Sequence, residues 1–282
     1  MANLKSIKEI IGTIDWQGNL DTVFKEVKYD SRKVEKGDLF VAIKGYKNDG
    51  HDYIYEAVKN GAAALVVERK PLSGVGVPWL KVKDSRLALS RISAHINDYP
   101  SQKLRVIGVT GTNGKTTTTN LIETILLHAG KKVSLMGTVE NRILEKPVET
   151  KLTTPDSPEL QGLLAEMAAA GSEYAVMEVS SHALKLKRVA DCEFDAAVFT
   201  NITQDHLDFH PTFEDYFNTK AELFYNLHNG KKQGKKFGVV NLDDPHGKII
   251  AEKAQVPIIT YGFSEKADAR AEEVDIGPKG TR

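Results

Sequence analysis

The stretch LRVIGVTGTNGKTT, at residues 104–117, joins an apolar run to a glycine-rich turn. The run 104–110 predicts a buried β-strand, and residues 116–129 predict a helix that ends at Gly130. A strand, a tight turn and a helix in this order are typical of a phosphate-binding loop. Backbone N–H groups and the positive end of the helix both face such a turn, so we expect a nucleotide phosphate there.

Two side chains of this turn suit a magnesium nucleotide. Lys115 can reach the terminal phosphates, and the Thr116 hydroxyl can ligate Mg²⁺. The spacing departs from G-x-x-x-x-G-K-[ST], because Val109 stands at the first glycine position. A chance turn is the alternative, and the strand–helix setting argues against it. The expected ATP-binding residues of the loop are Gly111, Thr112, Asn113, Gly114, Lys115, Thr116 and Thr117.

Working outward from this loop, strands and helices alternate along the chain, which predicts an α/β fold. We expect a small domain over residues 1–100 and a second, incomplete domain over residues 101–282, with a mostly parallel, doubly wound sheet. The expected strands are residues 39–43, 64–67, 104–110, 132–136, 174–179, 196–200 and 237–241. The expected helices are residues 53–59, 85–99, 116–129, 158–170 with Ser157 as cap, and 213–225.

Composition excludes several protein classes. Lys+Arg and Asp+Glu both number 38, so no excess of positive charge indicates binding to nucleic acid. Cys192 is the single cysteine, which fits a reducing compartment. The N-terminus lacks the apolar run of a signal peptide, and no stretch approaches the roughly 20 apolar residues of a membrane span. We expect a cytoplasmic protein without membrane insertion.

Three further residues are candidates for the chemistry. Glu178 ends an apolar strand, at the sheet edge where open α/β folds bind ligands, and it is interpreted as a Mg²⁺ ligand rather than a surface carboxylate. His206 lies in a polar loop after another strand and is a candidate second ligand, although zinc is disfavoured. Lys220 lies beside an apolar helical stripe; composition alone favours a solvated surface lysine over one with a lowered pKa.

Four separated motifs together resemble the Mur ligase family. They are TGTNGKTT at 110–117, EVSSHAL at 178–184, NITQDHLDFH at 201–210 and YFNTKAELF at 216–224. YDSR at 29–32, GDLFVA at 37–42, DGH at 49–51 and TTP at 153–155 are similar to the member that forms the tripeptide. The resemblance covers residues 25 to 275.

The resemblance implies three domains, which bind a uridine nucleotide, ATP and the incoming amino acid; we expect this chain to stop within the second. It also implies an ATP-dependent ligase of cell-wall synthesis. ATP, with Mg²⁺, would phosphorylate the D-glutamyl side chain of UDP-N-acetylmuramoyl-L-alanyl-D-glutamate. A diamino acid, meso-diaminopimelate or L-lysine, would then attack the acyl phosphate. We expect a monomer.

Residue roles follow from the same resemblance. Ser31 and His51 would lie near the uridine diphosphate. The muramoyl peptide would be held by Thr153, Thr154, Ser180 and Arg188. Mg²⁺ would be held by Thr116, Glu178 and His206, and also by Lys220 if CO₂ carbamylates it, while Asn241 would contact adenine. The expected catalytic residues are Lys115, Lys220 and His206. Leu152 and Leu186 depart from the polar residues of some relatives.

Two alternatives remain open at this point. A folylpolyglutamate synthase would share the phosphate loop and the acyl-phosphate chemistry, but its first domain is not of the Asp-Ser-Arg type found at residues 30–32. A fragment that binds nucleotides without ligating them is the second alternative.

Overall fold

The computed structural model describes residues 2–45, 48–71, 74–149, 152–277 and 280–281. The chain divides into two compact units. Unit 1 consists of Met1–Pro100, Pro155–Ala165 and Leu186–Cys192, and unit 2 of Ser101–Thr154, Glu166–Lys185 and Glu193–Arg282. The first unit therefore includes two segments that the sequence placed in the second domain.

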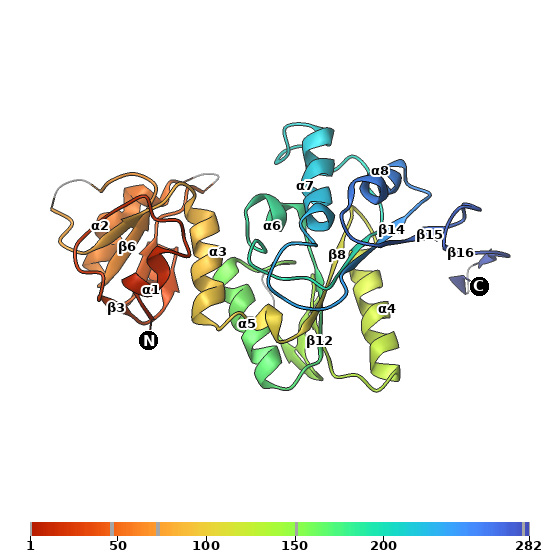
Figure 1. Cartoon of the computed structure of the whole chain (residues 1–282), viewed down its shortest axis with the longest axis horizontal. Coiled ribbons are helices and arrows are strands. Elements are labelled where there is room, and N and C mark those ends of the chain that lie inside the picture. Colours follow the sequence, from red (N-terminus) through yellow and green to blue (C-terminus); the bar gives the residue numbers. More distant parts are fainter. Residues whose placement is uncertain (1, 46–47, 72–73, 150–151, 278–279, 282) are drawn as a thin grey trace. The chain divides into compact units, whose positions relative to one another are not determined.

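Unit 1 is built around a five-stranded sheet in the order β2-β7-β6-β5-β4 (Figure 1). Strands β4 to β7 run parallel, and β2 is antiparallel to β7 at the edge. Its elements are β1 (Ala2–Asn3), α1 (Leu4–Lys8), β2 (Asp15–Gln17), β3 (Val23–Phe24), β4 (Val27–Lys28), β5 (Leu39–Val41), α2 (Ile54–Lys59), β6 (Ala64–Val67), β7 (Trp79–Lys81) and α3 (Ser85–Ile96).

Both faces of this sheet are buried, which explains why its strands read as continuous apolar runs. Leu39 and Val41 belong to the core cluster that includes α1 and α3. Phe40, between them, belongs to the cluster on the opposite face with Ala57 of α2. Successive side chains of a strand point to opposite faces, so an uninterrupted apolar run is what a doubly covered sheet requires.

Unit 2 contains a nine-stranded sheet in its described part, in the order β11-β10-β9-β12-β8-β13-β14-β15-β16. From β9 to β16 the strands are parallel, which confirms the predicted fold class. Its strands are β8 (Arg105–Thr110), β9 (Val133–Met136), β10 (Asn141–Ile143), β11 (Lys146–Val148), β12 (Tyr174–Glu178), β13 (Ala196–Phe199), β14 (Phe237–Asn241), β15 (Ile258–Gly262) and β16 (Ala269–Arg270). A separate antiparallel pair joins β17 (Ile276–Gly277) and β18 (Gly280–Thr281).

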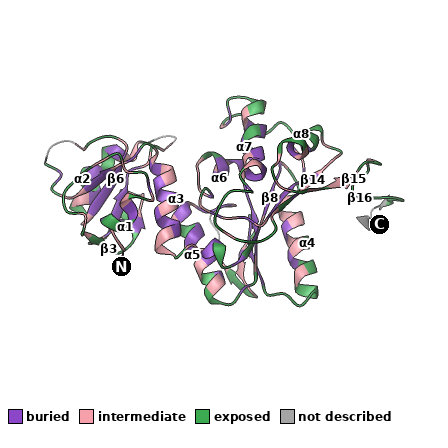
Figure 2. Cartoon of the chain, in the orientation of Figure 1, coloured by how far each residue is buried: buried purple, intermediate pink, exposed green. Residues whose placement is uncertain are grey.

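Helices cover the central strands of this sheet, which are largely buried (Figure 2). Helix α4 packs against β8, β9 and β12, α8 packs on β14, and α7 contacts α6 and α8. The helices are α4 (Lys115–His128), α5 (Ser157–Ala169), α6 (Ser181–Lys185), α7 (Phe213–Tyr225) and α8 (Pro245–Lys253). Residues up to Ala165 of α5 belong to unit 1.

Most predicted elements are present, and their ends shift by a few residues. The helix predicted over 85–99 ends at Ile96, because Asp98 and Tyr99 adopt positive φ, which a right-handed helix cannot include. The helix predicted from residue 158 already includes Ser157, whose hydroxyl donates to the Arg188 carbonyl instead of capping. Within the described ranges, none of the helices combines the length and apolar character needed to cross a bilayer.

Candidate nucleotide and metal site

The phosphate loop connects β8 to α4 in the predicted way. Strand β8 ends at Thr110, and α4 begins at Lys115 with Gly114 as its N-cap. Gly114 has a φ of +83°, a conformation that L side chains rarely adopt. At Gly111 an added Cβ would lie only 1.9 Å from the Thr200 Oγ1 atom. Glycine is therefore required at Gly114 by the backbone conformation and at Gly111 by the closeness of the Thr200 side chain.

The segment that follows β13 holds the phosphate loop from its other side. The Thr200 hydroxyl donates to the Asn113 carbonyl at 2.7 Å. The Asn113 N–H donates to the Asn201 side-chain oxygen at 3.0 Å, and the Thr112 N–H to the Asn201 carbonyl at 2.9 Å. These bonds, all across about 90 residues of sequence, preorganise the turn before any phosphate arrives.

Lys115 folds back over the loop that it is predicted to serve. Its ammonium group donates to the Gly111 carbonyl at 3.0 Å and to the Thr112 carbonyl at 2.9 Å. Burial lowers the pKa of Lys115, while the carboxylates of Glu178 and Asp205 act in the opposite direction. A bound phosphate would replace neutral carbonyls with an anion as the partner of this ammonium.

Glu178 is a buried carboxylate at the end of β12, with 1% of the residue exposed, so the surface reading does not apply. Its Oε1 accepts from the Thr116 hydroxyl at 3.0 Å and from the Thr138 N–H at 2.8 Å. Its Oε2 accepts from the Thr138 hydroxyl at 3.0 Å. The two predicted Mg²⁺ ligands, Thr116 and Glu178, are thus in contact, as their places at the carboxyl edge of the sheet suggested.

Lys220 corrects the expectation from composition, because the residue is buried, with 1% exposed. It lies on α7, between apolar neighbours, and its ammonium group donates to the Gly111 carbonyl at 2.9 Å. The same carbonyl accepts from Lys115. Burial lowers the pKa of Lys220 to about 7, and the positive charge of Lys115 lowers it further. Much of this lysine is therefore a neutral amine near pH 7.

Sequence reasoning missed Tyr216, which links Lys220 to the phosphate loop. Its fully buried ring lies 4.6 Å from the Lys220 Nζ atom, and its hydroxyl lies 3.1 Å from the Thr112 Oγ1 atom. Tyr216 precedes Lys220 by four residues on a helix, so both face the same side. That spacing was the available signal. Thr138 was also missed, although it follows β9 at the same sheet edge as Glu178.

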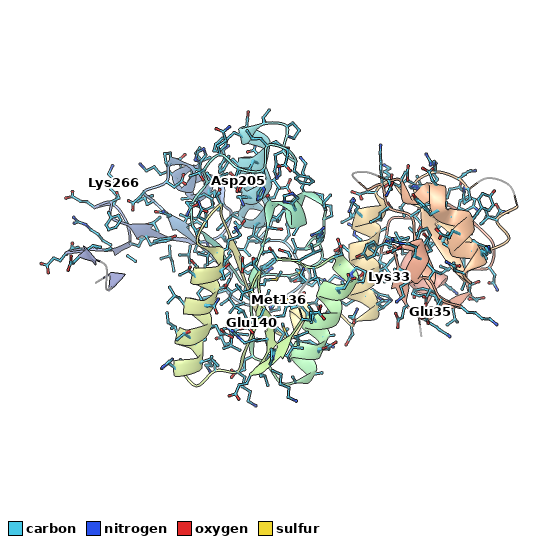
Figure 3. The ribbon with its side chains drawn as sticks, turned by 180° about the vertical axis from the view of Figure 1, so that it is seen from behind. Lys33, Glu35, Met136, Glu140, Asp205 and Lys266 are labelled. Carbon is cyan, nitrogen blue, oxygen red and sulfur yellow. The ribbon has the colours of Figure 1, made fainter. Side chains whose placement is uncertain are left out.

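His206 lies in the loop between β13 and α7, which Figure 3 marks at its neighbour Asp205. Its backbone has a φ of +54°, and 44% of its side chain is exposed. The ring packs edge-on against His182 of α6, with centroids 4.9 Å apart. The left-handed backbone marks a constrained loop, and the side chain remains open to a ligand.

Asn241, predicted to contact adenine, uses its side chain within the fold. Its amide nitrogen donates to the Thr200 carbonyl at 2.9 Å, and its oxygen accepts from the Asp243 N–H at 3.0 Å. The neighbouring Asp244 accepts from the Ile202 N–H at 2.8 Å. Asn241 and Asp244 therefore support the segment that holds the phosphate loop.

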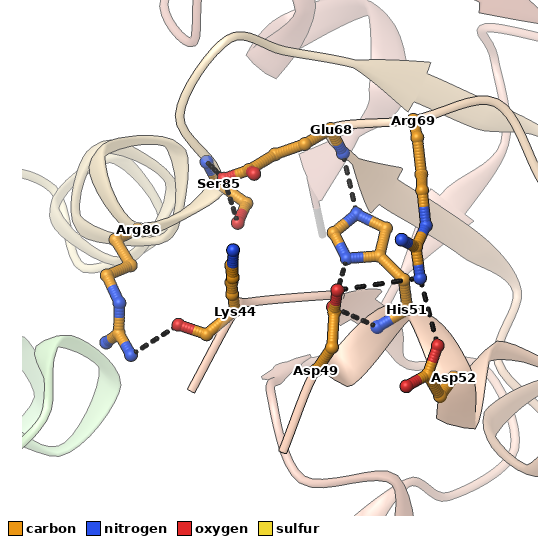
Figure 4. A network of polar contacts seen from close by, with 8 residues as sticks. All are labelled: Lys44, Asp49, His51, Asp52, Glu68, Arg69, Ser85 and Arg86. Atoms are coloured by element: carbon orange, nitrogen blue, oxygen red, sulfur yellow. Dashed lines mark hydrogen bonds and ion pairs between the residues drawn. The ribbon is translucent and has the colours of Figure 1, made fainter. Parts of the chain in front are cut away.

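Ser31 and His51, predicted to lie near uridine diphosphate, belong to unit 1 and are engaged internally. The Ser31 hydroxyl donates to Glu56 at 2.6 Å. The His51 Nδ1 atom lies 2.6 Å from Asp49, and its Nε2 accepts from the Glu68 N–H at 2.8 Å (Figure 4). Both side chains shape the loops around them.

The four residues predicted to hold the muramoyl peptide fall into different units. Thr153, Thr154 and Ser180 belong to unit 2, and Arg188 belongs to unit 1. The Thr154 hydroxyl donates to the Glu178 carbonyl at 2.9 Å and accepts from the Ser180 N–H at 3.1 Å. Within unit 2 the Thr154 hydroxyl therefore bonds the main chains of Glu178 and Ser180.

The donor atoms suit magnesium. Among the described residues, no group of three or more His, Cys, Asp or Glu side chains gathers to hold a metal ion. Mg²⁺ is usually held by one or two carboxylates together with phosphate oxygens and water, so it needs no such group. A buried carboxylate and a hydroxyl at a phosphate loop, Glu178 and Thr116, fit this requirement.

Comparisons with known proteins agree with the resemblance. Residues 109–282 match the model of the Mur ligase middle domain, and residues 23–97 match that of the Mur ligase family catalytic domain. In the solved structures, one described as UDP-N-acetylmuramoyl-L-alanyl-D-glutamate--2,6-diaminopimelate ligase matches with a TM-score of 0.79 and 29% identity. The match covers 99% of this chain and 56% of that one.

Curated relatives carry the same description. The UDP-N-acetylmuramoyl-L-alanyl-D-glutamate--2,6-diaminopimelate ligase 1 of Clostridium acetobutylicum is 43% identical over 98% of this chain and 56% of its own. The corresponding ligase of Geobacillus thermodenitrificans is 47% identical over 93% of this chain and 53% of its own. The chain thus spans about half the length of the curated relatives that it matches.

Proposed function

The chain belongs to the Mur ligase family, and from that premise we propose that it takes part in an ATP-dependent peptide ligation. In the proposed reaction, a diamino acid is added to UDP-N-acetylmuramoyl-L-alanyl-D-glutamate. The names of the 43% and 47% identical relatives support diaminopimelate as that amino acid. The reaction would proceed through an acyl phosphate, as the family resemblance implies.

One observation carries the proposal: a preformed phosphate loop adjoins a buried carboxylate. Thr116, the first residue after Lys115 on α4, donates its hydroxyl hydrogen bond to Glu178 at 3.0 Å. In this assignment Thr116, Glu178 and His206 would hold Mg²⁺, which would neutralise charge on the triphosphate. Thr112, Asn113 and Thr117 of the loop would bind the phosphates, and Asn241 would contact adenine.

The remaining steps are phosphoryl transfer to the substrate and formation of the amide bond. Lys115 would pair with the terminal phosphates and lower the repulsion between triphosphate and carboxylate. The D-glutamyl carboxylate attacks the γ-phosphorus, ADP leaves, and the amine of the amino acid then displaces phosphate from the acyl carbon. Holding both anions in place is the main task, because phosphoryl transfer depends on positioning and electrostatic stabilisation.

Lys220 has the properties that carbamylation by CO₂ requires. A neutral amine is the reactive form, and burial with a pKa of about 7 supplies one. The product would be an anion beside the Lys115 ammonium, so carbamylation would add an attraction between the two side chains. We propose that this carbamate helps hold a second Mg²⁺.

Substrate contacts in the proposal follow the family pattern. In this proposal Ser31 and His51 contact the uridine diphosphate. The muramoyl peptide is contacted by Thr153, Thr154, Ser180 and Arg188. A folylpolyglutamate synthase activity is disfavoured, because residues 23–97 match the Mur ligase family model. Competition binding with the muramoyl dipeptide and with a folate separates the two substrates.

Calorimetry with magnesium adenylyl-imidodiphosphate tests the nucleotide site. We expect binding by the 282-residue chain, and affinity roughly 30- to 150-fold weaker in Lys115→Met, because a charged hydrogen bond contributes about 2–3 kcal/mol. Lys248→Met, an exposed lysine of α8, is the matched control and should bind normally. Absence of heat with the unaltered chain would remove the proposal.

A second candidate function is a nucleotide-binding protein without ligase turnover. The preformed phosphate loop supports nucleotide binding whether or not ligation follows. A turnover assay with both substrates and ATP decides between the two. Tripeptide product from residues 1–282 would assign ligation to this length of chain, whereas binding without product would assign binding alone.

A further inference from the structure

Asp156 forms an ion pair with Arg188 inside unit 1. Its Oδ1 atom lies 2.7 Å from the Arg188 Nε atom. Both side chains are mostly buried, with 21% of Asp156 and 16% of Arg188 exposed. The ion pair holds the guanidinium against the carboxylate, and a guanidinium has five N–H donors with which it can recognise anions.

The second oxygen of Asp156 is also used. The Tyr29 hydroxyl donates to Oδ2 at 3.0 Å, so the carboxylate joins Arg188 to the segment just before Ser31. Burial raises the pKa of Tyr29, and the carboxylates of Asp156 and Glu159 raise it further. The phenol therefore keeps its proton and remains a donor to Asp156.

The residue after Asp156 holds the backbone at the same point. The Ser157 hydroxyl donates to the Arg188 carbonyl at 3.1 Å. Two consecutive residues at the start of α5 thus fix both the main chain and the side chain of Arg188. Arg86 is a second guanidinium in this unit; burial lowers its pKa, Asp156 acts to raise it, and Arg188 lowers it. Asp156 therefore pairs with Arg188 and is one of the acids that act on Arg86.

We propose that Asp156 is a positioning residue, which sets the orientation in which Arg188 receives the anionic muramoyl-peptide part of the substrate. The inference rests on the proposed function, which places Arg188 at that part of the substrate. Tyr29 acts with Asp156 by fixing the carboxylate itself. Neither residue needs to touch the substrate through its side chain for this role.

Calorimetry with two ligands separates positioning from a general structural role. The 282-residue chain is titrated with UDP-N-acetylmuramoyl-L-alanyl-D-glutamate and with UDP. We expect Asp156→Asn to weaken binding of the precursor about tenfold and to leave UDP binding unchanged, because only the precursor reaches Arg188. Glu166→Gln, at an exposed acid of the same helix, should match the unaltered chain with both ligands.

A double-mutant cycle tests whether Asp156 acts through Arg188. Once Arg188→Ala has weakened precursor binding, adding Asp156→Asn should cost little more. Tyr29→Phe, which removes a single hydroxyl, should lower the affinity for the precursor about threefold and leave UDP binding unchanged. This variant replaces Asp156→Asn in the test if Asp156→Asn does not fold.

The outcomes are distinguishable. Full additivity, or an Asp156→Asn variant that loses UDP and precursor equally, overturns the positioning role. The role is also overturned if Asp156→Asn binds the precursor with unchanged affinity while Arg188→Ala binds it more weakly. Failure of the unaltered chain to bind the precursor would instead remove the proposed function on which the inference rests.

Discussion

At the scale of single residues, Lys220 shows how burial changes the acid–base behaviour of a side chain. Its ammonium group shares the Gly111 carbonyl with Lys115, and in the described part of the chain none of its hydrogen-bond partners is a carboxylate. Desolvation and a neighbouring cation both disfavour the charged form, so its pKa falls to about 7. The amine is protonated as the pH falls below that value and neutral as it rises above.

Carbon-13 spectroscopy can detect the predicted carbamate. With ¹³C-labelled bicarbonate at pH 8, we expect a carbamate signal that disappears in Lys220→Met and persists in Lys248→Met. The signal should fade as the pH drops through about 7, because the protonated amine does not react. A signal that is unchanged in Lys220→Met would assign the carbamate to another lysine.

Ligation should respond to the same substitution. In a protein that ligates, Lys220→Ala should lower turnover by about two orders of magnitude or more, because the metal site would lose an anion. Formate or acetate at high concentration should restore part of the rate by replacing that charge. Full turnover in Lys220→Ala would remove Lys220 from the mechanism.

At the scale of elements, the phosphate loop depends on the segment after β13. Thr200 and Asn201 accept and donate hydrogen bonds along the whole turn, and Asp244 fixes the next residue, Ile202. The segment after β13 therefore holds the turn between β8 and α4, and Asp244, after β14, holds that segment in place. The two segments pack so closely at Gly111 that they leave no room for a side chain.

Gly111→Ala should disturb both segments. The new Cβ would lie 1.9 Å from Thr200 Oγ1, so Thr200 must move away from the Asn113 carbonyl. We expect a loss of about 1–3 kcal/mol in the free energy of unfolding and weaker binding of the magnesium nucleotide. Urea denaturation and calorimetry measure the two effects.

Gly162→Ala is the matched control for that substitution. Gly162 lies within α5, and an added Cβ there meets nothing within 4 Å. Alanine should stabilise this helix by roughly 0.5–1 kcal/mol and leave nucleotide binding unchanged. Equal stability and binding in both alanine variants would show that the phosphate loop tolerates a side chain at Gly111.

At the scale of the whole molecule, unit 1 is assembled from three segments of the chain. Pro155–Ala165 and Leu186–Cys192 join Met1–Pro100. Tyr29 bonds Asp156, and the Asp191 N–H donates to the Ser90 hydroxyl of α3 at 3.2 Å. A boundary at residue 100 therefore separates groups that are bonded to one another.

A polypeptide of residues 1–100 should consequently be less stable than unit 1 in the intact chain. We expect α3 to lose protection against amide hydrogen exchange, equivalent to about 1–3 kcal/mol, because the partners of Tyr29 and Ser90 are absent. Exchange measured by mass spectrometry on both proteins gives the comparison. Equal protection of α3 would show that the first hundred residues suffice.

Much of the site could be predicted because its parts are local in sequence. The apolar strand, the glycine turn and the helix at residues 104–129 follow from residue type and spacing alone, and so does the position of Glu178 at a strand end. The resemblance to the Mur ligases also rests on short motifs, and the family comparison confirms it. Local patterns determine such elements because hydrophobic periodicity and turn chemistry act over a few residues.

Only the tertiary structure decided which of these groups meet. Lys220 looked like a surface lysine, the spacing of Tyr216 from Lys220 did not reveal its contacts, and Asp156 had no distinguishing pattern. Burial and pairing depend on residues about 100 positions away. Desolvation and hydrogen bonding are set by all neighbours in space, whereas composition records only neighbours in the chain. The sequence alone therefore determined the elements and the family, and packing determined the pKa of Lys220 and the partners of Arg188.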